Sequence, residues 1–263
     1  MPIAMSSASD ALLDAAASLY QSAGKFALRF ARGKLRHDPL FIAVLKSSLI
    51  KNGMTVLDLG CGQGLLLALL HSAENQYQRG AWPIDWPPPA LGLELHGIEL
   101  RKREVAIARK ALGSFARITL LDLRAGDIPH ADVVTVFDVL HYLEAKAQLD
   151  LIQRIARAIS PGGLLLVRDI DAAAGFSYRL THLVERIAAI CRGHFRQHFH
   201  FRSRTPLLVD NRSPNKARIS STAVLILMGT ALIFILSINQ CACLAWRRGK
   251  YHKTLLSVIP PLD

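Results

Sequence analysis

The chain has 263 residues, 51% of them hydrophobic, which supplies enough apolar side chains for a packed core and excludes a disordered polar chain. A formal net charge of +12 favours nucleic acid, an anionic membrane surface or an acidic small molecule as partner, although a solvated basic surface explains it equally well. The four cysteines have neither the paired spacing of a zinc site nor the density of a disulfide scaffold, so we expect no bound metal. Asp10 and Asp14 interrupt the apolar core that an export signal needs, which predicts a cytoplasmic protein.

The first predicted unit, residues 1–52, has a helical pattern from about Ala11 to Lys46. Between Gly24 and Arg36, phenylalanines lie four residues apart, while basic residues form a second stripe at spacings of three or four. Such a helix is compatible with a solvated face, with membrane contact or with a lid over a pocket. We expect this unit to help cover the pocket described below.

The second unit, residues 53–175, alternates strand and helix, which predicts a doubly wound, Rossmann-like α/β fold. Short apolar strands indicate a mainly parallel sheet with helices on both faces, and such sheets bind ligands at the carboxyl ends of their strands. A proline-rich stretch with Trp82 and Trp86 predicts an inserted loop before the second strand. The expected strands are Thr55–Leu59, Leu95–Leu100, Ala116–Leu121, Asp132–Phe137 and Leu164–Ile170, and the expected helices are Gln63–Ser72, Lys102–Leu112 and Glu144–Ile159, the last one stopped by Pro161-Gly162-Gly163.

A glycine-rich turn, VLDLGCGQGLL at Val56–Leu66, follows the first strand. It is not a P-loop, because Gly64 is followed by leucines, and its glycine spacing is one residue too short for the dinucleotide fingerprint. Asp58 would also repel a pyrophosphate. An acid before the loop suits a ligand with a cationic end, and S-adenosylmethionine has an ammonium, a sulfonium and a carboxylate that backbone N–H groups can bind.

These residues resemble the Asp-x-Gly-x-Gly-x-Gly loop of class I S-adenosylmethionine-dependent methyltransferases, a resemblance that covers about residues 57–171. It implies that Glu99, at the end of the second strand, accepts hydrogen bonds from both ribose hydroxyls, although the proline-rich insert makes the spacing from the loop longer than the usual ~20 residues. It also implies that Asp122 and Leu123 contact the adenine and that Asp138 lines the methionine half. The full expected cofactor-binding set is Asp58, Gly60, Cys61, Gly62, Gly64, Glu99, Leu100, Asp122, Leu123 and Asp138.

Methyl transfer is an in-line displacement, for which the protein mainly supplies alignment and a dry pocket. An acceptor that must lose a proton also needs a base. His141, just beyond the fourth strand, is the candidate catalytic base, with Tyr142 a weaker candidate for positioning; a structural role for the buried histidine is the alternative.

The acceptor is expected to be a small, hydrophobic or lipid-like, perhaps acidic molecule. The third unit, residues 176–210, contains a predicted helix at Arg179–Cys191 with an apolar face, which would cover the pocket together with residues 1–52. The chain is similar to small bacterial methyltransferases of lipid, quinone and polyene-pigment pathways. An RNA substrate is second, because no RNA-binding module is recognisable. A cofactor-binding but inactive membrane-associated protein is a further alternative.

The fourth unit, residues 211–263, departs from the family pattern, in which an antiparallel strand pair completes a seven-stranded sheet. Ala223–Ile238 is an unbroken run of apolar and small residues. Three interpretations stay open: a transmembrane helix, a buried hairpin turning at Met228-Gly229, and a tail that is not a functional ending. The helix is the preferred hypothesis, because the run extended to Trp246 approaches the about 20 residues of a membrane span. The helix would then tether the catalytic domain to a membrane, and the larger number of basic residues before the run would keep that domain on the inner, cytoplasmic face.

Overall fold

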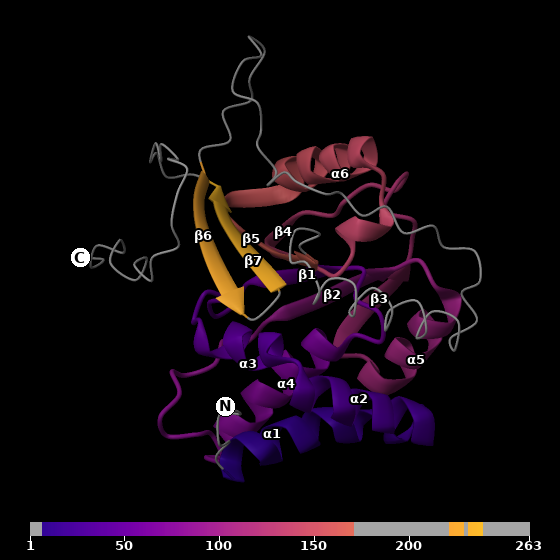
Figure 1. Cartoon of the computed structure of the whole chain (residues 1–263). Coiled ribbons are helices and arrows are strands. Elements are labelled where there is room, and N and C mark those ends of the chain that lie inside the picture. Colours follow the sequence, from indigo (N-terminus) through magenta and orange to yellow (C-terminus); the bar gives the residue numbers. More distant parts are fainter. Residues whose placement is uncertain (1–6, 171–220, 229–230, 239–263) are drawn as a thin grey trace, which may run out of the picture.

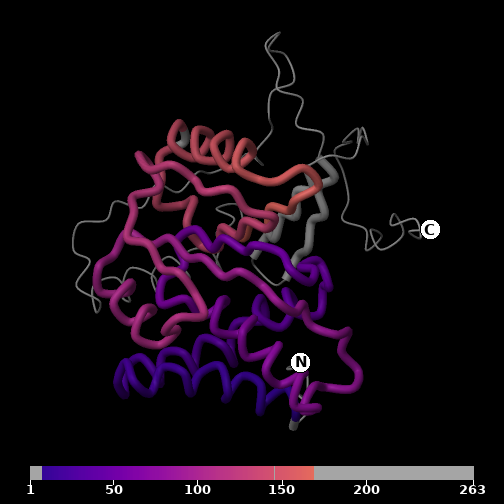
Figure 2. Tube along the Cα trace, turned by 180° about the vertical axis from the view of Figure 1, so that it is seen from behind, coloured from indigo at the N-terminus to yellow at the C-terminus, as the bar shows by residue number. Residues whose placement is uncertain are grey.

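The computed structural model describes residues 7–170, 221–228 and 231–238 (Figures 1 and 2). Its centre is a seven-stranded sheet with the order β3-β2-β1-β4-β5-β7-β6. The first five strands in the chain pair in parallel, and β7 pairs antiparallel with both β5 and β6. The strands are β1 (Thr55–Leu59), β2 (Glu94–Glu99), β3 (Ala116–Leu120), β4 (Ala131–Phe137), β5 (Ile159–Ile170), β6 (Ser221–Met228) and β7 (Ala231–Ile238).

Helices cover both faces of this sheet, as Figure 1 shows. Successive residues of a strand point to opposite faces, so Val56 of β1 packs with the N-terminal helices while Leu57 packs with α6. The predicted doubly wound, mainly parallel fold is therefore confirmed. One face carries α1 (Ser7–Ser18), η1 (Leu19–Gln21), α2 (Lys25–His37), α3 (Pro39–Lys46), α4 (Leu65–Gln78) and α5 (Lys102–Leu112); the other carries α6 (Ala145–Ala158), with η2 (Leu140–Tyr142) before it.

The site-forming edge follows from the strand order. After β1, the chain adds β2 and β3 on one side and β4 and β5 on the other, so the order reverses between β1 and β4. Ligands of open α/β sheets bind at such a switch point, beyond the carboxyl ends of the strands. In the register of the sheet, Asp58 lies beside Gly97 of β2 and Thr135 of β4, which places the glycine loop at that edge.

In the second unit, two predicted boundaries differ from the structure by more than two residues. Helix α4 continues to Gln78, beyond the predicted end at Ser72. Strand β5 begins at Ile159 rather than Leu164, so Pro161-Gly162-Gly163 lies inside the strand and not in a turn before it. The register with β4 jumps there, from Ala131 opposite Ile159 to Val133 opposite Leu164. A proline has no N–H to donate, and such an irregularity is where a sheet tolerates one.

The prediction of a transmembrane helix at Ala223–Ile238 is wrong: this run forms strands β6 and β7. Each strand has eight residues, and Gly229 lies between them, so the run divides into two strand lengths and not one helix. Periodicity alone does not distinguish a buried strand from a buried helix, which is why the sequence left both open. No helix in the described part of the chain is long and apolar enough to cross a membrane. The predicted helix Arg179–Cys191 falls outside the described residues.

Asp38 joins the N-terminal helices to the sheet. It is the N-cap of α3, where its Oδ1 accepts a hydrogen bond from the Leu40 N–H at 3.0 Å. The same carboxylate pairs with Arg168 of β5 at 2.6 Å and with Lys34 of α2 at 2.8 Å. Burial alone would raise the pKa of Asp38, but the hydrogen bonds and charges of Arg168 and Lys34 outweigh it and lower the pKa to about 2.

We predict that Asp38→Asn lowers the free energy of unfolding at pH 7 by about 3 kcal/mol, because asparagine keeps the cap but leaves the buried Arg168 without one of its anions. A lowered folded-state pKa contributes stability above the unfolded-state value of about 4 and loses it as the pH falls towards 2. Denaturant unfolding at pH 7 and pH 2.5 should therefore show a smaller difference at the lower pH. The exposed Asp85→Asn is the control; an equal effect in both variants contradicts the prediction.

Candidate functional site

The glycine loop between β1 and α4 has a backbone that favours glycine. Gly60, Gly62 and Gly64 have φ values of 73°, 57° and 78°, in the left-handed region that L side chains rarely adopt. A Cβ on Gly60 would also lie 2.3 Å from the side chain of Val139. The N–H groups of Gly60 and Cys61 donate to the Ile98 carbonyl at 2.8 and 3.1 Å, so the loop is fixed to the end of β2.

Glu99 lies beside this loop, as the sequence predicts. Its Oε2 accepts a hydrogen bond from the Gly62 N–H at 2.9 Å, and its Oε1 accepts one from the Arg101 N–H at 2.9 Å. The carboxylate is buried and also forms an ion pair with the Arg101 guanidinium. Burial would raise the pKa of Glu99, but the hydrogen bonds and charge of Arg101 and the Gly62 N–H together lower it. The ionised form is therefore favoured at this position.

Asp58 lies at the end of β1, below the loop, and is 5% exposed. Its Oδ1 accepts a hydrogen bond from the Thr135 hydroxyl of β4 at 2.7 Å. Burial, supplemented by the negative charge of Glu99, raises the pKa of Asp58 to about 7, against the opposing effect of that hydrogen bond. The site thus holds two carboxyl groups with opposite pKa shifts, and a cation bound near Asp58 would favour its ionised form.

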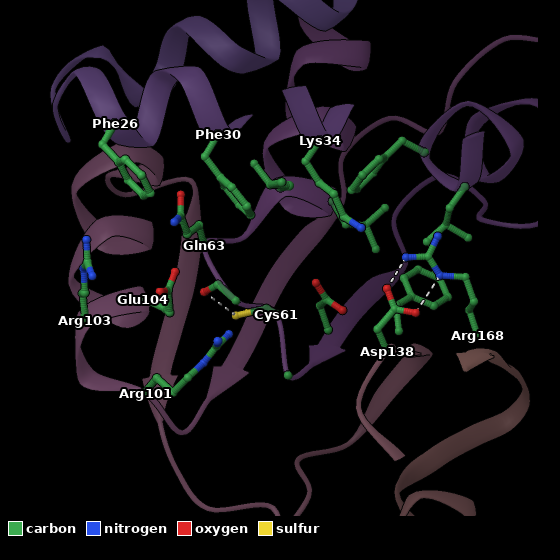
Figure 3. A pocket seen from close by; sticks show the side chains of 18 residues that line it. Phe26, Phe30, Lys34, Cys61, Gln63, Arg101, Arg103, Glu104, Asp138 and Arg168 are labelled. Atoms are coloured by element: carbon green, nitrogen blue, oxygen red, sulfur yellow. Dashed lines mark hydrogen bonds and ion pairs between the residues drawn. The ribbon is translucent and has the colours of Figure 1, made fainter. Parts of the chain in front are cut away.

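A cavity lies between the loop and the N-terminal helices (Figure 3). Its floor is the loop from Asp58 to Gln63, and α2 and α3 contribute Phe26, Phe30 and Phe41 above it. Phe137, Asp138 and Arg168 close it at the ends of β4 and β5. Helices α2 and α3, which contribute these side chains, belong to the predicted unit of residues 1–52.

The structure brings together one part of the predicted set. Gly64 is the N-cap of α4, directly behind the loop. The cavity is lined by Asp58, Gly60, Cys61, Gly62 and Asp138. Glu99 is not among the described lining residues, but it is hydrogen-bonded to Gly62, which is.

Leu100 of the predicted cofactor-binding set, and the predicted adenine contacts Asp122 and Leu123, are not among the described residues that line this cavity. Leu100 is 48% exposed, and Leu123 is buried in the core on the α6 face. The Asp122 carboxylate pairs with Arg124 at 2.6 Å, and this hydrogen bond lowers the pKa of Asp122. These three residues follow β2 and β3 at the correct edge of the sheet, as expected from the strand order.

His141, the predicted base, is buried in η2 beside Tyr142, with ring centroids 4.1 Å apart. It is not among the described residues that line the cavity. Asp138, three residues earlier, does line it, with an unusual φ of 57° for a residue that is not glycine.

A network centred on Arg168 was not predicted from the sequence. Its guanidinium pairs with Asp38 at 2.6 Å. It also contacts both carboxylate oxygens of Asp138, as Figure 3 shows, with Nε to Oδ1 at 3.0 Å. A single arginine in the apolar strand Leu164–Ile170 was the available signal, because a buried cation needs an anionic partner. The network connects three parts of the fold at one end of the cavity: α3, the segment that follows β4, and strand β5.

Tyr20 was a second omission. This buried residue of η1 donates a hydrogen bond from its hydroxyl to the Gln63 carbonyl at 2.8 Å, so the N-terminal helices hold the loop directly. Burial raises the pKa of Tyr20, and Cys61 and Asp58 add to this effect, which keeps the hydroxyl protonated.

A Rossmann-like sheet with an acid–glycine loop defines a class of nucleotide-binding proteins. The family comparison is more specific: a model described as a methyltransferase domain matches residues 28–210. The chain therefore belongs to the methyltransferase domain family, within the class I S-adenosylmethionine-dependent methyltransferases, as its loop indicated.

A curated relative, carboxy-S-adenosyl-L-methionine synthase of Chromohalobacter salexigens, is 28% identical over 125 residues, which are 46% of this chain and 41% of the relative. The chain thus spans about two fifths of that protein's length.

Two solved structures share the fold, each with a TM-score of 0.50. An O-methyltransferase family protein from Burkholderia thailandensis is 19% identical and covers 83% of this chain and 61% of its own. The PH0226 protein from Pyrococcus horikoshii is 18% identical and covers 82% and 92%.

We predict that Thr135→Val raises the pKa of Asp58 further, because it removes the hydroxyl that favours the ionised carboxyl group. Carbon NMR of labelled aspartate carboxyl groups would measure the shift. A raised folded-state pKa means that stability falls as the pH rises from about 4 to the folded-state value of about 7, so the variant should continue to lose stability above pH 7, where the wild type levels off. The exposed Thr119→Val serves as control. An unchanged Asp58 titration contradicts the assigned hydrogen bond.

Proposed function

We propose that this protein transfers a methyl group from S-adenosylmethionine to a small, hydrophobic or lipid-like acceptor by in-line displacement. The observation that carries the proposal is the pairing of a buried acid in β1 with a second acid, Glu99, that is bonded to the glycine loop. Family membership supplies the reaction class and the cofactor.

The loop geometry supports one orientation of the cofactor. The ribose would lie at Glu99, the adenine towards Leu100, Asp122 and Leu123, and the methionine end along Gly60 to Asp138. The sulfonium group of the cofactor supplies an activated methyl, so the chain's own residues need to bind, align and exclude water. Cys61 and Gly64 belong to this proposed binding set through their backbone positions.

The cavity wall favours an uncharged acceptor. Phe26, Phe30, Phe41 and Phe137 provide aromatic surface. Three of the basic residues in the lining already have partners, because Lys34 pairs with Asp38, Arg168 with two carboxylates and Arg101 with Glu99. This pairing gives no support to an acidic acceptor. We propose that residues 1–52 act as a lid, and that residues 176–210 complete it.

His141 stays a proposed proton acceptor for an acceptor group that ionises on methylation, such as a hydroxyl. Its place on η2, directly after the cavity residue Asp138, supports this role, and its burial outside the lining favours the structural alternative. The proposed compartment is the cytoplasm, where the cofactor is made.

The inactive membrane-associated alternative loses its main motivation, since β6 and β7 complete the seven-stranded sheet that the sequence analysis could not find. An RNA substrate rests on net charge alone and stays second.

We predict that Glu99→Gln weakens binding of S-adenosylmethionine about 10- to 100-fold, because an amide oxygen and nitrogen cannot both accept from a sugar diol. Calorimetry on the wild type and the variant measures this change, with Glu94→Gln, at the exposed start of the same strand, as matched control. NAD should not bind. Tighter binding of NAD than of S-adenosylmethionine by the wild type would contradict the proposal.

We also predict transfer of a tritiated methyl group from the cofactor into the lipid-soluble fraction of a cell extract. His141→Ala should reduce this transfer about 100-fold or more while leaving cofactor affinity within twofold, if the histidine removes a proton. A label found in RNA, or no transfer despite tight cofactor binding, would support the RNA or the inactive alternative respectively. A variant as active as the wild type would give His141 a structural role.

A further inference from the structure

The Glu99 carboxylate is already saturated by the protein's own donors. Its Oε1 accepts from the Arg101 backbone N–H at 2.9 Å and from Arg101 Nε at 3.0 Å. Its Oε2 accepts from the Gly62 N–H at 2.9 Å and from Arg101 Nη2 at 3.3 Å. An ionised carboxylate has about four acceptor positions, so these contacts use all of them. Two come from the backbone, and the other two come from one side chain.

The two contacts from the Arg101 side chain to Glu99 have the same arrangement as the contacts that a sugar diol would make. Arg101 gives one N–H to each carboxylate oxygen, and a ribose bound through its 2′ and 3′ hydroxyls would give one O–H to each. The guanidinium also lies over the loop, since its Nη2 is 3.7 Å from where a Cβ on Gly62 would be. Arg101 lines the cavity. Its guanidinium therefore occupies the positions on Glu99 that the sugar needs.

We propose that Arg101 competes with the ribose for Glu99, so that its side chain must leave the carboxylate before the cofactor's sugar binds. This inference rests on the proposed function, because it assumes that Glu99 is the ribose ligand. Arg101 thereby sets the affinity for the cofactor without being required for binding.

The surroundings provide an alternative place for the displaced guanidinium. Glu104, in the first turn of α5, is 7% exposed, lines the same cavity and interacts electrostatically with Arg101. Among the described residues, no basic side chain forms an ion pair with Glu104. A partly exposed arginine has the reach to exchange one carboxylate for the other, while the two backbone N–H groups keep Glu99 oriented.

The consequence is that replacing a residue of the binding site should strengthen cofactor binding instead of weakening it. When the binding-competent arrangement is only a fraction of the population, the apparent dissociation constant rises by the inverse of that fraction. Removing the competing side chain removes this cost. We expect Arg101→Leu to bind S-adenosylhomocysteine roughly tenfold more tightly than the wild type, with a faster association rate.

Calorimetry and stopped-flow binding at pH 8 test this expectation on the full-length chain. Lys102→Leu is the matched control, because it removes the neighbouring exposed charge from the same helix without touching Glu99, and its affinity should stay within twofold. Arg101→Lys should be intermediate, since an ammonium is a point charge that does not reproduce both contacts. Melting temperatures establish that each variant is folded.

The proposal is supported if Arg101→Leu binds S-adenosylhomocysteine most tightly, Arg101→Lys less tightly and the wild type least tightly. Equal or weaker binding by Arg101→Leu overturns it, because Arg101 would then be neutral or a direct contact; should that variant not fold, Arg101→Lys decides by the same criterion. The proposed function fails in a different way, with no binding by any of these proteins. Binding by Arg101→Leu but not by the wild type supports both the proposed function and the competition by Arg101.

Discussion

The structure depends on one hydrogen bond between two neighbouring strand ends, from the Gly62 N–H of the β1 loop to the Glu99 carboxylate of β2. The bond requires a left-handed glycine, a parallel register that brings the two strand ends level, and a buried acid kept ionised by nearby donors. The local backbone conformation, the register of the sheet and the donors around Glu99 each meet one of these requirements. A carboxylate fixed in this way is preorganised for a ligand, because no side-chain freedom is lost when the ligand binds.

A second constraint lies at the other end of the cavity. Arg168 holds Asp38 of the N-terminal helices and Asp138 of the segment after β4 with different edges of one guanidinium. A planar donor with several N–H groups suits such an arrangement, and a lysine, as a point charge, would not reproduce the two-oxygen contact to Asp138. The N-terminal helices and the sheet are thus joined by charge as well as by apolar packing. The same network pairs two basic side chains of the cavity lining, Lys34 and Arg168, with carboxylates.

Much of the sheet was predictable, because short apolar strands and acidic residues at strand ends are local features. Asp58, Gly62 and Glu99 lie together in the structure, as their place at adjacent strand ends requires. What the sequence did not reveal depends on contacts between distant residues. Arg168 and Asp38 are 130 positions apart, and nothing near either residue indicates the other. The apolar run after residue 222 was ambiguous for a different reason: a hairpin of two buried strands and a helix have the same composition, and only pairing with β5 decides.

The most direct measurement of the central assignment is a crystal structure of the protein with S-adenosylhomocysteine. We expect both ribose hydroxyls to lie within hydrogen-bonding distance of the Glu99 oxygens, with the Gly62 N–H still bonded to the same carboxylate and the Arg101 side chain moved away from it. A ligand whose sugar lies elsewhere in the cavity, with Glu99 still held by Arg101, would contradict this assignment.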